Sequence, residues 1–335
     1  PTRKNGNICI PGINHTYNRY TMKLAFLING NARKYTELQQ QLKATFRDQQ
    51  TSFFISQSAG HLTQLATEAI TQGFDHIVIC GGDGTLNEGI NGIVQAFKLN
   101  DNGGTADYDW QKIAQIKVGV LPFGSGNDFS KTVHITKEIS YLKNLIEKGR
   151  SQMVDIGWVS FINTKEQPAT RFYMNITDVG MGGETALKLQ HKIGVLGPDI
   201  NYFWAITSSL ATYKNVHIEA TGDDFHYEGK VINFVVANGR FFGNGLGIAP
   251  EASVTDGKFD IVIIGDITLM DYFKNLGKVK RSEKLIHPKV QYHRLQKVSI
   301  QAKEDRRITI DMDGEFIGHA PMTLECLAQR ICLIC

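Results

Sequence analysis

The chain has 335 residues, of which 42% are hydrophobic, and its formal net charge is +3 at pH 7. A chain of this length can bury a sizeable core and is expected to split into two domains. The small positive charge does not indicate a nucleic acid as the partner. The sequence also contains no run of 18 or more apolar residues, the kind of run that crosses a membrane.

The first 21 residues differ from the rest of the chain. Residues 1–21 carry no apolar segment like that of a signal peptide. Because a clear strand pattern begins at Met22, we interpret these residues as an added leader or a mis-assigned start and leave them out of the predicted fold.

The cysteines form no disulfide framework, although two of them make a CxxC pair. They are Cys9, Cys80, Cys326, Cys332 and Cys335. An odd number without framework spacing favours a reduced, cytoplasmic protein over a zinc or redox site.

Strands and helices are predicted to alternate from residue 22 to about residue 150. Short apolar runs predict buried strands at 23–29, 52–56, 76–80 and 116–122. Apolar residues recur at helical spacing between these runs, as Leu86, Ile90 and Ile93 do, and again in residues 138–148. Strands separated by helices indicate a parallel sheet covered on both faces, in which ligands bind beyond the carboxyl ends of the strands.

Residues 151–320 are predicted to form a second domain that is rich in strands. Short β-rich runs separated by turn residues fall at 154–161, 171–179, 215–220, 227–239, 258–265, 296–302 and 306–314. Their spacing indicates an antiparallel sandwich or barrel-like domain, interrupted by helical inserts at 201–214 and 269–284. The last segment, residues 321–335, is expected to return to the first domain.

Two glycine-rich stretches follow predicted strands, "CGGDGTLNEGING" at 80–92 and "LPFGSGNDFSK" at 121–131. Backbone N–H groups and a helix N-terminus can face a phosphate at such turns. Neither stretch completes a GxxxxGK[ST] P-loop or a GxGxxG fingerprint. Asp83 and Asp128 would repel phosphate without a cation, and their oxygen atoms favour Mg²⁺. In the alternative interpretation the first stretch is only a tight turn, and Asp83 caps the helix after it.

Together with "VDIG" at 154–157, the long stretch 235–264 and "DMDGEFI" at 311–317, these motifs resemble the diacylglycerol kinase-like lipid kinases, particularly the soluble bacterial ones. That family is related to sphingosine kinases and more distantly to NAD kinases. The resemblance covers nearly everything after Met22. It implies a Rossmann-like α/β domain of the NAD kinase and diacylglycerol kinase type, followed by a β-rich antiparallel sandwich. It also implies ATP- and Mg²⁺-dependent phosphorylation of a lipid hydroxyl, on diacylglycerol or a related lipid.

By position, the resemblance implies a nucleotide site built from the glycine loops and the ends of the first two strands. We expect its residues to be Asn29, Ser56, Gly81, Gly82, Asp83, Gly84, Thr85, Leu86, Asn87, Ser125 and Asp128. The stretch "INGNARK" at 28–34 departs from the family, where Asn-Pro and a glycine-rich turn are usual. The detailed phosphate contacts of this first loop are therefore expected to differ.

The general base is expected at Glu315, because the glutamate of the DGE motif is the proposed base of the family. Asp83 is expected to act with it by organising Mg²⁺ at the phosphates. The alternation of "RITIDMDG" places Asp311 and Asp313 on the face opposite the apolar residues, with a turn at Asp313-Gly314. Asp313 is thus the rival base.

A second, structural Mg²⁺ is expected in "SVTDGKFD" at 253–260. The family has a site here, with the Asp256 side chain and backbone carbonyls that match Ser253 and Lys258 by position. The alternative is an ordinary turn in which the Asp256 side chain hydrogen-bonds its own backbone.

Three functions are weighed. The leading one is a cytoplasmic lipid kinase that binds a lipid substrate peripherally at the inner face of the membrane, without nucleic acid, and that could also form a homodimer. The basic segment 274–284 would contact anionic lipid, unless it is only a solvated helix face. The alternatives are an NAD kinase-like nucleotide kinase and a non-catalytic nucleotide-binding regulatory protein.

Overall fold

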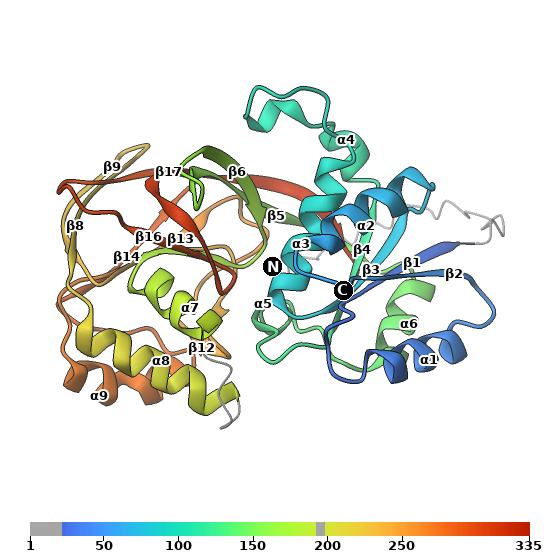
Figure 1. Cartoon of the computed structure of the whole chain (residues 1–335), viewed down its shortest axis with the longest axis horizontal. Helices are drawn as coiled ribbons and strands as arrows, with labels where there is room; N and C mark the ends of the chain where they lie inside the picture. The colour runs from blue at the N-terminus through green and yellow to red at the C-terminus, as the bar shows by residue number, and fades with distance from the viewer. Residues whose placement is uncertain (1–21, 192–197) are drawn as a thin grey trace, which may run out of the picture.

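A computed structural model of the chain describes residues 22–191 and 198–335 and shows two lobes of different architecture (Figure 1). The expected leader, residues 1–21, lies outside the described residues. The first lobe holds a parallel sheet in the order β4-β3-β1-β2. Its strands are β1 (Lys23–Ile28), β2 (Gln50–Ile55), β3 (His76–Gly81) and β4 (Lys117–Pro122).

Helices cover both faces of this sheet. The four longer ones are α1 (Tyr35–Thr45), α2 (His61–Thr71), α3 (Asp83–Gln95) and α6 (Ile139–Glu147). The short ones are η1 (Thr105–Asp107), α4 (Trp110–Ile113) and α5 (Asp128–Thr132). Apolar residues of α2 and α3 pack with one face of the strands, whereas those of α1 and α6 pack with the other. Burial on both faces explains the nearly continuous apolar strand sequences, and the predicted α/β domain is confirmed.

The second lobe is built from antiparallel strands, which confirms the predicted β-rich domain. Its strands are β5 (Gln152–Asn163), β6 (Pro168–Tyr173), β7 (Ile176–Gly180), β8 (Val216–Gly222), β9 (Phe225–Val231), β10 (Asn233–Ala237), β11 (Phe241–Phe242), β12 (Leu246–Gly247), β13 (Phe259–Ile264), β14 (Val290–Leu295), β15 (Lys297–Ala302), β16 (Thr309–Met312) and β17 (Glu315–Leu333). Inward-facing aliphatic and aromatic residues of these strands form one large core. The helices of this lobe are α7 (Met181–His191), α8 (Pro198–Thr212) and α9 (Leu269–Lys280).

Three expectations about this lobe were wrong. The run 171–179 is not one strand, because β6 ends at Tyr173 and pairs with β5, whereas β7 begins at Ile176 and pairs with β10 and β16. The run 227–239 is not one strand, because the chain leaves β9 at Val231 and enters β10 at Asn233. β9 pairs with β8, whereas β10 pairs with β7 and β13. Helix α7 was not expected from the sequence, since its first turn contains Gly182 and Gly183, and glycine disfavours helices.

The long strand β17 joins the lobes. It pairs antiparallel with β16, β15 and β5, and its end at Cys332 and Leu333 pairs parallel with Lys117 and Val118 of β4. In the described residues one 15-stranded sheet therefore includes strands of both lobes, and only β11 and β12 form a separate two-stranded sheet. Figure 1 shows β17 in red at the boundary between the lobes.

Candidate active site

A polar cavity of about 460 Å³ lies where the carboxyl ends of β1, β2, β3 and β4 meet the turn between β16 and β17. Its wall includes Asn29, Ser56, Gly82, Asp83, Gly84, Thr85, Ser125, Asp128, Asp311, Asp313 and Glu315. The cavity thus combines both glycine loops with the DGE motif from the other end of the sequence. This is the edge at which parallel sheets bind ligands.

The two glycine loops touch through their backbones. A side chain on Gly124 would collide with the backbone of Gly82, so only glycine allows this approach. Next to this contact, the Asn29 side chain donates a hydrogen bond to Thr85 Oγ1 over 3.2 Å. The Gly30 N–H donates to Ser56 Oγ over 3.3 Å. The loop that departs from the family pattern is therefore still held against the predicted nucleotide residues.

Asp83 joins the two glycine loops. Its carboxylate accepts the backbone N–H of Asp128 (2.9 Å) and that of Phe129 (3.0 Å), at the N-terminus of α5. Asp83 is itself the first residue of α3, whose N-cap Gly82 makes no side-chain cap. The interpretation in which Asp83 caps its own helix is thus wrong, because the carboxylate caps α5 instead. Burial and the negative charge of Asp128 raise the pKa of Asp83.

Asp128 has its own partners. Its Oδ1 lies 2.8 Å from Lys131 Nζ, and its Oδ2 accepts the N–H of Asn244 over 2.8 Å. The Asn244 contact ties the second glycine loop to the β11–β12 hairpin of the other lobe.

Asp313 and Glu315 are held by residues far away in the sequence. Asp313 accepts the Asn87 side-chain amide (2.9 Å) and the N–H of Ile176 (3.0 Å). Burial raises its pKa to about 7. Glu315 forms an ion pair of 3.1 Å with Arg171, which also donates to Asn87 Oδ1 over 2.8 Å. One network therefore positions both carboxylates of the DGE motif.

Three residues expected at the nucleotide do not line the cavity. Gly81 ends β3 beneath Thr85, and Leu86 packs in the core of the first lobe. Asn87 is 2% exposed, and its amide binds Asp313. The structure thus gives Asn87 a positioning contact that the sequence alone did not indicate.

The expected structural metal site lies apart from this cavity. Ser253 Oγ lies 3.2 Å from Thr255 Oγ1, and Asp256 accepts the N–H of Lys258 over 3.2 Å, as in the alternative turn. Arg294 already places a positive charge 3.9 Å from Asp256. The Lys258 N–H and Arg294 already serve the Asp256 carboxylate, so the turn does not require a metal ion.

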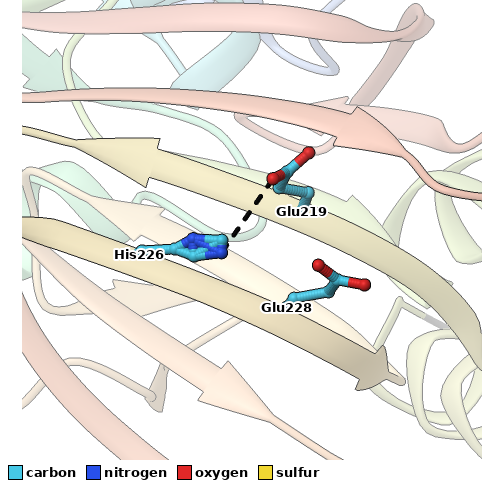
Figure 2. Close-up of side chains that lie close together, drawn as sticks. All are labelled: Glu219, His226 and Glu228. Atoms are coloured by element: carbon cyan, nitrogen blue, oxygen red, sulfur yellow. Dashed lines mark ion pairs between the residues drawn. The ribbon is translucent and has the colours of Figure 1, made fainter.

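One other group of described side chains has metal-ligand geometry. Glu219, His226 and Glu228 stand together on β8 and β9 (Figure 2). Lys303 Nζ lies 3.3 Å from Glu219 and 3.6 Å from Glu228, and Gln301 donates to Glu219 over 2.7 Å. Because a lysine already neutralises these carboxylates, the group does not require a metal ion.

An apolar cavity of about 120 Å³ adjoins the polar one. It lies between α7, α8, α9 and the sheet, and aliphatic residues make up most of its wall. Phe242, Asp311 and Gly314 line both cavities. The sequence alone did not indicate the residues at which the two cavities meet.

Each lobe matches a known family of protein domains. Residues 23–159 match the model of the diacylglycerol kinase catalytic domain, and residues 179–335 match that of the YegS C-terminal NAD kinase beta sandwich-like domain. The diacylglycerol kinase of Staphylococcus carnosus (strain TM300) is 26% identical over 282 residues, which are 84% of this chain and 83% of that protein. That of Staphylococcus saprophyticus is 26% identical over 283 residues, 84% of each chain.

Solved structures show the same fold. A crystal structure described as a diacylglycerol kinase from Bacillus anthracis has a TM-score of 0.63 at 19% identity, and it covers 94% of this chain and 97% of that one. Another Bacillus anthracis crystal structure has a TM-score of 0.67 at 22% identity with the same coverage. The fold and the cavity define a two-domain protein of the diacylglycerol kinase type. The chain belongs to the diacylglycerol kinase-like lipid kinase family.

Proposed function

We propose that this protein transfers the γ-phosphoryl group of ATP to the hydroxyl group of a lipid. The observation that carries this proposal is the meeting of two cavities at Phe242, Asp311 and Gly314. The polar cavity offers glycine-loop amides and helix N-termini to phosphates, whereas the apolar cavity offers a surface for an alkyl chain. A soluble dinucleotide has no group that would use the apolar cavity, so this arrangement favours a lipid over NAD as the acceptor.

On the nucleotide side, the chain holds phosphates between the two glycine loops. The donors there are backbone N–H groups and the Thr85 hydroxyl. The carboxylates of Asp83 and Asp128 fit Mg²⁺, because carboxylate oxygens are its preferred ligands. Burial, and then the negative charge of Asp128, raises the pKa of Asp83. A bound Mg²⁺ would offset the repulsion between these carboxylates and the phosphates.

On the lipid side, the DGE turn supplies the base. The lipid hydroxyl oxygen forms a bond to the γ-phosphorus, the bond from that phosphorus to the bridging oxygen of ADP breaks, and the hydroxyl proton passes to a carboxylate. Asp313 suits this step, since its pKa of about 7 lies near the working pH. Glu315, the base predicted from the sequence, is the rival, and its ion pair with Arg171 occupies one of its oxygens.

We propose that the protein binds the membrane surface through α8 and α9. None of the described helices is long and apolar enough to span a membrane. Large apolar side chains are exposed on and after these helices, namely Trp204, Met270, Phe273 and Ile286. Lys274, Lys278 and Lys280 add positive charge on α9, whose Tyr272 and Val279 line the apolar cavity. Lipid could therefore reach the cavity from the surface that α9 presents.

Transfer of labelled phosphate tests the proposal. The purified full chain is given ATP labelled at the γ-phosphate, Mg²⁺ and mixed micelles of a total lipid extract, and the organic phase is counted. We expect label in a lipid product. Label found only in NADP when NAD is offered would establish the nucleotide kinase instead. Tight ATP binding with no transfer to any acceptor would establish a regulatory protein.

A further inference from the structure

Two acidic side chains face each other near the place where the cavities meet. Asp178 of β7 lies directly opposite Asp311 of β16 in the antiparallel pairing, so both side chains project from the same face of the sheet. Asp311 lines both cavities. Asp178 is 1% exposed, and a side chain on Gly182, in the wall of the apolar cavity, would collide with its carboxylate. The pair thus lies against the apolar cavity at its polar end.

Among the residues that the structure describes, neither carboxylate has the partners that its burial calls for. Oδ2 of Asp178 and Oδ1 of Asp311 are buried without a hydrogen-bond donor from these residues. Oδ1 of Asp178 accepts the side-chain amide of Asn233, which lies 3.0 Å away when the amide nitrogen faces β7. The described charges that act on Asp311 are those of Asp178, Asp313 and Glu315, all acidic, and only the backbone N–H of Gly314 acts in the opposite direction. Buried charge of one sign is costly, and such groups normally have a cationic partner.

The pKa values reflect the burial of both groups and the negative charge around Asp311. Burial raises the pKa of Asp178, and burial together with the negative charge of its neighbours raises the pKa of Asp311 well above its usual range. A positive charge bound between the carboxylates would satisfy both unpaired oxygens and lower both pKa values.

The surroundings favour one kind of cation. The apolar cavity is small and mainly aliphatic. Mg²⁺ usually keeps several bound water molecules, and aliphatic side chains offer these waters no hydrogen bonds, so the cavity does not suit Mg²⁺. A primary ammonium has three N–H donors for the unpaired oxygens and can carry an alkyl chain on the same molecule. The part of the lipid chain next to the ammonium would then occupy the cavity while the ammonium lies at Asp178 and Asp311.

We propose, building on the lipid kinase function above, that the substrate is a long-chain amino alcohol whose ammonium group binds between Asp178 and Asp311. The neighbouring hydroxyl then reaches the polar cavity and the carboxylates of the DGE turn. Diacylglycerol has no positive group and would leave both aspartates unpaired. A site built to bind a polar group of its substrate rejects analogues that lack it.

The experiment compares two lipids that differ only at the nitrogen atom, where acetylation removes the positive charge and two N–H donors and adds an acetyl group; the Asp311→Asn variant separates the charge from the added bulk. One is a C18 2-amino-1,3-diol, and the other is the same molecule with its nitrogen acetylated. We expect kcat/KM of the wild-type full chain to be higher for the free amine by about 10- to 100-fold, the range of a charged hydrogen bond. Asp311→Asn should remove most of this preference. Asp223→Asn, in the exposed turn between β8 and β9, is the matched control and should keep it.

The ratio of the two kcat/KM values is diagnostic, because a folding defect lowers both together. Equal values for the amine and its acetylated form in the wild type would overturn the amino-alcohol substrate. A uniform loss on both lipids in Asp311→Asn, as expected for a lost Mg²⁺ ligand, would overturn it as well. Transfer to diacylglycerol but not to the amine would leave the lipid kinase function standing and refute this substrate. No transfer to any lipid would refute both.

Discussion

Replacing Asp313 with asparagine keeps the size of the side chain and removes the proton acceptor that we propose for the lipid hydroxyl. Only the ionised carboxylate accepts a proton, and burial raises its pKa to about 7. Below that pH the ionised fraction falls about tenfold per pH unit, so kcat/KM of the parent should rise with pH and level off above about pH 7. At about pH 6 it should reach roughly a tenth of the plateau.

The variant should lose both rate and pH dependence. A positioned base contributes roughly 10²–10⁴-fold, and we expect Asp313→Asn to lower kcat by about that factor. The rise in kcat/KM near pH 7 should disappear with it. The free energy of unfolding should fall only modestly. Asparagine can still accept the Ile176 N–H, and only the hydrogen bond from Asn87 is lost, because the Asn87 amide would face an amide nitrogen instead of an oxygen. Urea unfolding of the variant checks this point.

The assay is initial-rate phosphate transfer across this pH range, with Glu315→Gln beside it. Glu315→Gln removes the Arg171 ion pair but leaves Asp313 in place, so the rise near pH 7 should persist in this variant. The reasoning would be refuted by a parent profile that is flat between about pH 6 and pH 8. It would also be refuted if the rise survived in Asp313→Asn and vanished in Glu315→Gln, which would make Glu315 the base.

Three further changes test other parts of the site. Asp83→Asn should lower the free energy of unfolding by about 2 kcal/mol and weaken ATP binding, because one oxygen cannot accept both α5 amides; unfolding by urea within error of the parent would contradict this. Asp256→Ala should lower the melting temperature by removing the acceptor of the Lys258 N–H, and Mg²⁺ should change the melting of parent and variant equally, because the turn is satisfied without an ion; Mg²⁺ stabilisation of the parent that the variant lacks would show a structural ion at Asp256. Replacing Lys274, Lys278 and Lys280 with glutamine should lower the affinity for anionic liposomes, measured by sedimentation at low salt, by up to about 100-fold, since each basic residue near such a surface contributes about 1 kcal/mol. Binding that does not depend on salt would count against this surface.

Local patterns were sufficient to predict the first lobe. The apolar run 76–80 is buried on both faces, and its neighbours in the sheet share this property, so period and length identified the strands. Leu86, Ile90 and Ile93 lie on the buried face of α3, as their spacing indicated. These features depend on residues close together in the sequence.

Features that depend on distant contacts could not be predicted in this way. The run 227–239 has no turn residues such as Pro or Gly between Val231 and Asn233, so its sequence shows no break where the partner strands change. Helix α7 begins with glycines because the Asp178 carboxylate leaves no room for a side chain at Gly182. A tertiary contact thus requires glycine at a helical position, although glycine disfavours helices in sequence-based prediction.

The same division applies to the candidate site. The glycine loops and the DGE turn were recognisable as motifs, and the structure brings them to one cavity. Arg171 and Asn87, which hold Glu315 and Asp313, come from β6 and α3 and belong to no motif that we recognised. Only the folded chain shows that they support the predicted base and its rival.

Strand β17 explains how the two halves of the site keep their relative position. It begins at Glu315 in the cavity wall and ends beside β4, the strand that leads into the second glycine loop. β5 runs antiparallel to it from Asn163 back to Gln152, so two paired strands cross the boundary between the lobes. Separating the lobes would break the backbone hydrogen bonds between these two strands, whereas lobes joined by a single linker could move apart without breaking any. Access for the lipid is therefore expected through movement of α7, α8 and α9 at the apolar cavity, while the base and the phosphate loops stay fixed to one sheet.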